Sequence, residues 1–212
     1  VCQPMDGIGA LCRKYNCLLL VDTVTSLGGV PLYLDEWKID LAYSCSQKGL
    51  SCPPGLGPFS MNERAENKMS NRKDKVPNWY LDVSLLNKYW GSDRVYHHTA
   101  PVNMNFGIRE ALRLLAEEGL EVSWGRHRKN AKSLWSSLEN IGLELHVEEE
   151  LRLPTLTTVK IPDGVDGKAF TNHLLNNFGV EIGGGLGDLA GKVWRIGLMG
   201  YNSTSANVDK II

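Results

Sequence analysis

The stretch from Leu18 to Gly55 reads LLLVDTVTSLGGVPLYLDEWKIDLAYSCSQKGLSCPPG. Its first apolar run, Leu18 to Val21, predicts a strand that is buried on both faces and ends at Asp22. The run from Ile39 to Ser44 predicts the next strand, which leads to Lys48. Asp22 and Lys48 are 26 residues apart (48 − 22), about the length of a strand, a crossover and a second strand in an α/β sheet.

Asp22 and Lys48 match the two side chains that pyridoxal 5′-phosphate requires. A lysine joins the cofactor's aldehyde as a Schiff base, and an aspartate keeps its pyridine nitrogen protonated. Ligand sites of α/β sheets collect at the carboxyl ends of the strands. We therefore expect a buried Asp22 carboxylate there, with Lys48 as nucleophile and proton-transfer base. The alternatives are an exposed lysine that ends a strand and a turn or helix-capping aspartate.

The rest of the first half continues the α/β pattern. Asp6 is a candidate cap for a short amphipathic helix. Leu56 to Met61 predicts a third strand, and Asn62 predicts the cap of a polar helix after it. The segment from Asn71 to Arg94 is rich in aromatic residues and has no clear periodicity. It is expected to be irregular and to pack across a subunit interface or form a surface hairpin.

The second half predicts two long helices and a smaller α/β lobe. Apolar positions recur at helical spacing from Pro101 to Leu143, and Gly119 interrupts them. We place the domain boundary there, which gives domains of residues 1–118 and 119–212. The elements expected after it are strands at 143–147, 155–161, 180–182 and 193–198 and helices at 167–178 and near the C-terminus.

Composition excludes several classes of protein. The 212 residues contain 23 Lys and Arg against 24 Asp and Glu, so no net field favours nucleic acid or an anionic membrane surface. No apolar run approaches the roughly 20 residues of a membrane span. The five cysteines form no Cys-x-x-Cys pair and are odd in number, which indicates reduced thiols in an intracellular compartment and makes zinc a weak option.

Leu18 to Gly55 closely resembles the alanine–glyoxylate (serine–pyruvate) aminotransferases, class-V enzymes of fold type I that depend on pyridoxal phosphate. The likeness continues through VYHHT at Val95–Thr99, LRLPT at Leu151–Thr155 and VWRIGLMG at Val193–Gly200. Four motifs in order across the whole chain are more specific than any one of them.

The resemblance implies an α/β fold: the C-terminal portion of the large cofactor-binding domain in residues 1–118, then a small C-terminal domain in residues 119–212. It implies transfer of an amino group from alanine or serine to glyoxylate. Because the chain starts without methionine and leads at once into a helix-like segment that feeds a strand, we expect a fragment that lacks the N-terminal part of the family's chain.

The resemblance also assigns roles to further residues. Val24 matches the position that supports one face of the cofactor ring, and Gln47 matches a cofactor contact beside the lysine. Tyr96 and Thr99 match residues that bind the cofactor phosphate of the neighbouring subunit, which implies a homodimer with shared active sites. Arg195 matches the arginine that binds the substrate carboxylate; the alternative is a buried salt bridge.

Three other motifs are given structural interpretations. His97 and His98 suggest a metal site, but side chains of neighbouring residues on an extended chain point to opposite faces, so no metal is expected. Cys45 and Cys52 flank Lys48 and raise a competing chemistry, since cysteine desulfurases share the fold and use a cysteine persulfide, but packing is the better explanation. The glycine-rich run from Gly183 to Gly187 lacks the setting of a dinucleotide motif and is expected to be a flexible turn near the active-site mouth.

Several alternatives stay open from the sequence. A related transaminase with another donor, such as 3-hydroxykynurenine, shares these motifs, and a non-catalytic fragment is the option from a different class. The sequence does not rank alanine against serine. It is compatible with a peroxisomal or a cytoplasmic location, because any C-terminal targeting signal lies beyond Ile212.

Overall fold

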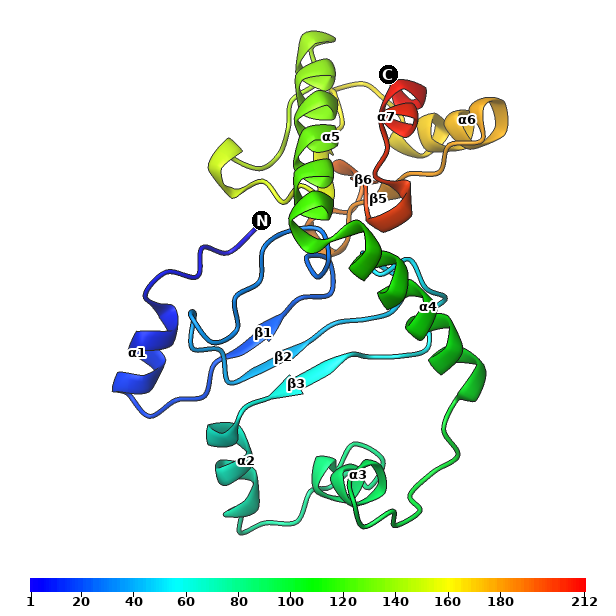
Figure 1. Ribbon diagram of the computed structural model, residues 1–212. Coiled ribbons are helices and arrows are strands. Elements are labelled where there is room, and N and C mark those ends of the chain that lie inside the picture. Colours follow the sequence, from blue (N-terminus) through cyan, green and yellow to red (C-terminus); the bar gives the residue numbers. More distant parts are fainter.

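Two three-stranded sheets organise the chain, and the computed structural model describes all 212 residues (Figure 1). The first sheet has the order β1-β2-β3. β1 (Leu20–Asp22) runs parallel to β2 (Leu41–Tyr43), and β3 (Phe59–Met61) pairs with β2 in the antiparallel direction. All three strands lie within the runs predicted from the sequence or extend them by one residue. The mixed α/β architecture is therefore confirmed.

β1 is more exposed than the sequence predicts. Leu20 is 56% exposed, so burial of Leu18 to Val21 on both faces is wrong. β1 is an edge strand that pairs only with β2, and no element of this chain covers the side chain of Leu20.

Four helices surround the first sheet (Figure 1). They are α1 (Ile8–Lys14), α2 (Glu63–Ser70), α3 (Val83–Trp90) and α4 (Val102–Glu118). Asn62 caps α2 as predicted, because its side chain accepts a hydrogen bond from the Ala65 N–H at 3.0 Å. Asp6 does not cap α1, where Gly7 holds that position without a side-chain bond. α3 lies inside the segment expected to be irregular, and Asp82 starts it by accepting from the Ser84 N–H.

A buried carboxylate fixes the base of the first sheet. Asp40, 1% exposed, precedes β2 and accepts a hydrogen bond from the Leu19 N–H at 2.8 Å. It also pairs with Arg64 of α2 at 2.7 Å and accepts from Asn62. Burial alone would raise the pKa of Asp40, but these hydrogen bonds and the charges of Arg64 and Arg13 outweigh it and lower the pKa. The pairing holds α2 and β1 against β2.

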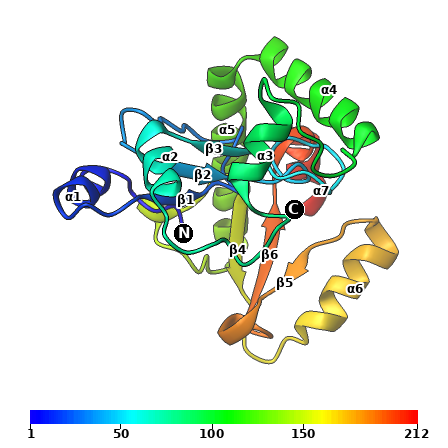
Figure 2. The same ribbon diagram turned by 90° about the horizontal axis from the view of Figure 1, so that it is seen from below.

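The second sheet forms the core of the other lobe (Figure 2). Its order is β4-β6-β5, all antiparallel. The elements of this lobe are α5 (Leu120–Asn140), β4 (Leu156–Lys160), α6 (Gly167–Phe178), β5 (Gly183–Gly184), β6 (Val193–Gly197) and α7 (Ser205–Ile211). Leu134 and Leu138 of α5 pack with Val159 of β4 and Trp194 of β6 in one buried cluster. The sheet therefore buries one face against α5.

Two predicted strands of this lobe differ from the structure. Residues 143–147 contribute only a single bridge, between Leu145 and Val159. The strand expected at 180–182 lies instead at Gly183–Gly184, within the glycine-rich run. That run is therefore not a flexible turn throughout, because its first two residues pair with β6.

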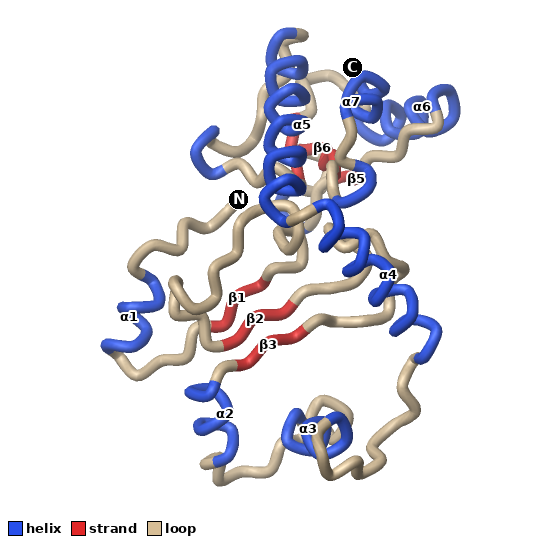
Figure 3. Tube along the Cα trace, viewed as in Figure 1, coloured by secondary structure: helices blue, strands red, loops and turns tan.

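α4 and α5 meet where the two lobes join (Figure 3). α4 ends at Glu118, α5 begins at Leu120, and Gly119 between them has φ +86°. A positive φ favours glycine, and Gly119 lets the chain change direction between the two helices. Arg126 of α5 pairs with Glu118 at 2.5 Å and closes the corner. No helix of the chain combines the length and the apolar character that crossing a membrane requires.

Candidate active site

The ends of β1 and β2 are joined at one edge of the first sheet. Asp22 and Tyr43, the last residues of the two strands, are partners in the parallel register. The Thr23 N–H donates to the Tyr43 carbonyl at 2.9 Å, and the Ser44 hydroxyl donates to the Thr23 carbonyl at 3.0 Å. The segments that follow β1 and β2 both leave the sheet here. Asp22 and the segment that leads to Lys48 therefore lie at the same carboxyl edge of the sheet.

Lys48 lies in a tight turn that packs on the loop after Asp22. The Ser51 N–H donates to the Lys48 carbonyl at 2.9 Å. Gly49 lies against the other loop so closely that a Cβ on it would be 2.2 Å from the Leu27 carbonyl oxygen. The Lys48 side chain is half-buried, and its amine forms no ion pair within the chain. The amine is therefore free to react.

Asp22 is exposed, so the predicted burial of its carboxylate is wrong. It is the last residue of β1, an edge strand that pairs only with β2. Its Oδ1 accepts from the Val24 N–H at 2.8 Å, and its Oδ2 accepts from the Tyr43 hydroxyl at 2.7 Å. Each carboxylate oxygen keeps a further lone pair, so Asp22 can still accept a hydrogen bond from a ring nitrogen.

Sequence reasoning missed Tyr43. Its hydroxyl donates to Asp22, and this hydrogen bond raises the pKa of Tyr43, because loss of the proton would leave two negative oxygens in contact. The signal that could have found it is positional: Asp22 and Tyr43 are each the last residue of a strand, and parallel pairing sets them side by side.

Val24 and Gln47 lie in the same two loops as Asp22 and Lys48. Val24 is half-buried, and its N–H orients Asp22. Gln47 is exposed and directly precedes Lys48. Cys45 is half-buried with its Sγ 4.0 Å from the Val24 carbonyl, and Cys52 is 6% exposed, so packing accounts for both thiols.

Arg195 extends from β6 without a carboxylate partner. Its Nε donates to the carbonyl of Gly184 in β5 at 2.6 Å, and β5 pairs with the strand that carries Arg195. None of the ion pairs in the chain includes Arg195, so the salt-bridge alternative is wrong within this chain. The two terminal nitrogens of the guanidinium keep the planar fork that matches a carboxylate.

Tyr96 and Thr99 lie in the connection between α3 and α4, and no hydrogen bond joins them to Asp22, Lys48 or Arg195 (Figure 1). Both are exposed, and their hydroxyls are 2.9 Å apart. His97 and His98 between them do not point to opposite faces: their Nδ1 atoms are 2.9 Å apart, because the chain bends at His98. The geometric reason given against a metal is therefore wrong, although a hydrogen bond accounts for this distance.

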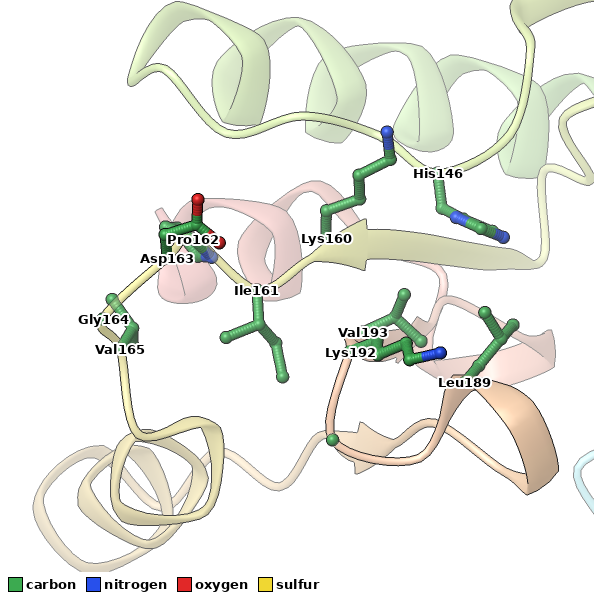
Figure 4. A pocket seen from close by; sticks show the side chains of 11 residues that line it. His146, Lys160, Ile161, Pro162, Asp163, Gly164, Val165, Leu189, Lys192 and Val193 are labelled. Atoms are coloured by element: carbon green, nitrogen blue, oxygen red, sulfur yellow. The ribbon is translucent and has the colours of Figure 1, made fainter.

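One cavity lies apart from all these residues. It has a volume of about 510 Å³ and lies at the end of the second sheet (Figure 4). Lys160, Asp163 and Lys192 are its charged lining residues, and Lys160 is already paired with Glu144. It shares no residue with the predicted site.

The chain matches a known protein family along almost its whole length. A family model described as aminotransferase class-V matches residues 1–211. An alanine–glyoxylate aminotransferase of Callithrix jacchus is 52% identical over 100% of this chain and 52% of its own length. The chain thus spans about half the length of such relatives.

Solved structures agree with the sequence comparison. A crystal structure of an alanine–glyoxylate aminotransferase from Nostoc sp. has a TM-score of 0.96 and 65% identity, over 99% of this chain and 56% of that one. A ureidoglycine–glyoxylate aminotransferase from Bacillus subtilis has a TM-score of 0.95 and 40% identity, over 99% and 54%. The resemblance drawn from the four motifs is confirmed, and the chain belongs to the class-V aminotransferase family.

Proposed function

We propose that this chain carries the cofactor-binding lysine of an aminotransferase that moves the amino group of alanine or serine to glyoxylate, giving glycine. The observation that carries the proposal is the meeting of the Asp22 and Lys48 loops at one sheet edge, where Lys48 has a free amine. Glyoxylate as acceptor is supported by two relatives, at 52% and 40% identity, whose names both include it.

The residues present fit pyridoxal 5′-phosphate, on which the class-V aminotransferase family generally depends. Lys48 offers an unpaired amine, and Asp22 offers an exposed carboxylate held by Val24 and Tyr43. Val24 and Gln47 lie in the same loops and complete the candidate cofactor-binding set. When bound, the cofactor supplies an aldehyde for the amino group and a ring that accepts the electrons released at the substrate's α-carbon.

Four side chains divide the work. With the cofactor bound, the Lys48 amine would take the proton from the substrate α-carbon and pass it to the cofactor's aldehyde carbon. The Asp22 carboxylate holds a proton at the ring nitrogen, and the Tyr43 hydroxyl fixes the position of that carboxylate. Arg195 binds the substrate carboxylate with two parallel N–H bonds and so aims the α-carbon at Lys48.

The active enzyme is a homodimer with shared sites. Tyr96 and Thr99 bind the cofactor phosphate of the neighbouring subunit; their exposure and the 2.9 Å between their hydroxyls support a paired anion contact. Residues 1–118 belong to the large domain and residues 119–212 to the small one, since α4 and α5 turn at Gly119. The enzyme acts inside the cell, in the peroxisome or the cytoplasm.

The donor can be identified by kinetics. We expect purified full-length protein, supplied with pyridoxal phosphate and glyoxylate, to use alanine or serine with kcat/KM at least about tenfold above that for ureidoglycine or 3-hydroxykynurenine. Glycine formation is measured, and glyoxylate is omitted in the control. A higher kcat/KM with ureidoglycine would assign ureidoglycine–glyoxylate transamination instead. Absence of transfer from every donor would reject the proposal that the protein is a transaminase.

A further inference from the structure

His127 of α5 lies where the two lobes and the loop after Asp22 meet. It is 0% exposed, although it is an ionisable residue. The backbone of Gly29, in the loop after Asp22, packs on the ring: a Cβ on Gly29 would be 3.3 Å from His127 Cδ2. Neither the cofactor nor the substrate is expected to reach a ring so deeply buried. Its role must therefore be exerted through the segments that it contacts.

We propose that His127 is a positioning residue that holds the turn after the Arg195 strand against the Lys48 loop. It thereby sets the position of the carboxylate-binding guanidinium relative to the proton-transferring amine. The inference rests on the proposed function, since it takes Lys48 and Arg195 to act on one substrate.

The hydrogen bonds of His127 determine its protonation state. Nδ1 lies 2.7 Å from the Ser123 carbonyl oxygen, which only accepts, so Nδ1 carries the proton and donates. Nε2 accepts from the Gly200 N–H at 2.9 Å and must keep its lone pair. Only the neutral imidazole with a proton on Nδ1 satisfies both. A protonated ring would set an N–H against the N–H of Gly200.

The turn held by His127 is in direct contact with the Lys48 loop. A Cβ on Gly200 would be 2.0 Å from the Ser51 Oγ and 2.7 Å from the Gly49 carbonyl oxygen. The Tyr201 N–H donates to Ser51 Oγ at 2.8 Å. Gly200 also has φ +55°, a conformation that favours glycine. Movement of this turn must therefore shift the residues that directly follow Lys48.

Two neighbours of His127 hold the carbonyl groups of the same turn. Arg126 donates to the Gly200 and Ser203 carbonyls, each at 2.8 Å, and Asn130 donates to the Ser203 carbonyl at 2.8 Å. His127 alone accepts the Gly200 N–H. A cavity of about 140 Å³ borders Gly200, Ser51 and Arg126, which leaves room for the turn to move once that acceptor is lost.

Burial of the His127 ring favours its neutral form. Burial lowers the pKa of His127; the Ser123 carbonyl and Glu118 of α4 oppose this shift without cancelling it, and Arg126 of α5 adds to it. The Gly29 loop and the Gly200 turn present no charged side chain to the ring. The imidazole therefore stays neutral at pH 7, as its two hydrogen bonds require.

Hydrogen–deuterium exchange of the full-length protein without cofactor tests the contact itself. His127→Phe fills the space but removes the acceptor, whereas His127→Gln retains a carbonyl oxygen. We expect exchange in peptides covering 199–203 and 49–52 to rise about tenfold in the phenylalanine variant and less than about threefold in the glutamine variant. Exposed His146→Phe is the matched control. Unchanged exchange at both segments in His127→Phe overturns the proposal.

Kinetics test the consequence for substrate binding. We expect His127→Phe to raise KM for the amino donor about tenfold, equivalent to about 1.4 kcal/mol, with kcat within about threefold of the parent and partial rescue by glutamine. A purely structural role predicts a lower Tm with unchanged KM, which would overturn the proposal. If the parent protein binds no cofactor, the proposed function fails. The exchange data still show whether His127 holds the turn at residues 199–203.

A pH series covers the case in which His127→Phe does not fold. After correction for intrinsic amide exchange rates, parent exchange at 199–203 should rise as the pH falls below the range in which His127 is neutral. His127→Gln should lack this rise. An equal pH response in both proteins overturns the proposal.

Discussion

Full-length protein carrying Lys48→Arg is expected to lose transaminase activity by about 10⁴-fold or more, the upper end of what one proton-transferring side chain contributes. Arginine retains the positive charge but does not release its proton at working pH and does not form the covalent bond to the cofactor aldehyde. The visible absorbance of lysine-bound cofactor should disappear together with activity. Both are measured on the same preparation.

The control for this substitution is Lys73→Arg, at an exposed position outside the site. It should retain parent activity and absorbance. If Lys48→Arg turned over within tenfold of the parent rate, Lys48 would not be the catalytic lysine.

The second large effect is expected at Arg195. Arg195→Lys should fold and retain cofactor but bind amino acids and glyoxylate about 30-fold or more weakly. The reason is that an ammonium does not reproduce the two parallel hydrogen bonds of a guanidinium. Loss of such a pair costs on the order of 2 to 5 kcal/mol. All substrates should be affected, since each presents the same carboxylate. Substrate titration and Tm are measured together.

Exposed Arg128→Lys in α5 is the matched control and should leave both quantities unchanged. In the structure, Arg195 makes no ion pair. Its Nε donates a hydrogen bond to the Gly184 carbonyl, and a lysine has no donor at that position of its side chain. A lowered Tm with unchanged alanine affinity would therefore show that Arg195 serves β5 packing rather than the substrate.

Local signals in the sequence were sufficient for much of the fold. Apolar runs bounded by polar residues predicted β2, β3 and β6, and helical periodicity with Gly119 as a break predicted α4 and α5. The side chain of Asn62 caps α2 through a bond three residues away, which is why sequence alone revealed it. Such features depend on neighbours along the chain, and the sequence contains those neighbours.

Long-range packing explains the predictions that were wrong. Leu20 and Asp22 are exposed because no other element of this chain covers their side chains. Which face of a strand is covered depends on segments far away in the sequence, and the apolar run itself does not encode it. β5 lies in a glycine-rich run because backbone pairing with β6, rather than side-chain pattern, makes it a strand.

The candidate site was predictable only in part. Spacing and chemistry singled out Asp22 and Lys48, and the resemblance added Val24, Gln47, Tyr96, Thr99 and Arg195. Tyr43 and His127 were missed, because their roles depend on contacts between segments far apart in the sequence. Tyr43 of β2 contacts Asp22 of the neighbouring strand β1, and His127 contacts Gly200, 73 residues later.

Lys48 is proposed to be the residue that binds the cofactor. The most direct measurement is borohydride reduction of the full-length protein loaded with one equivalent of pyridoxal phosphate, followed by peptide mapping by mass spectrometry. The reduced phosphopyridoxyl group is predicted on the peptide that contains Lys48, and on no peptide of Lys48→Arg. A stoichiometric label on another lysine, or an unlabelled Lys48 peptide in protein that transaminates alanine, would contradict the account.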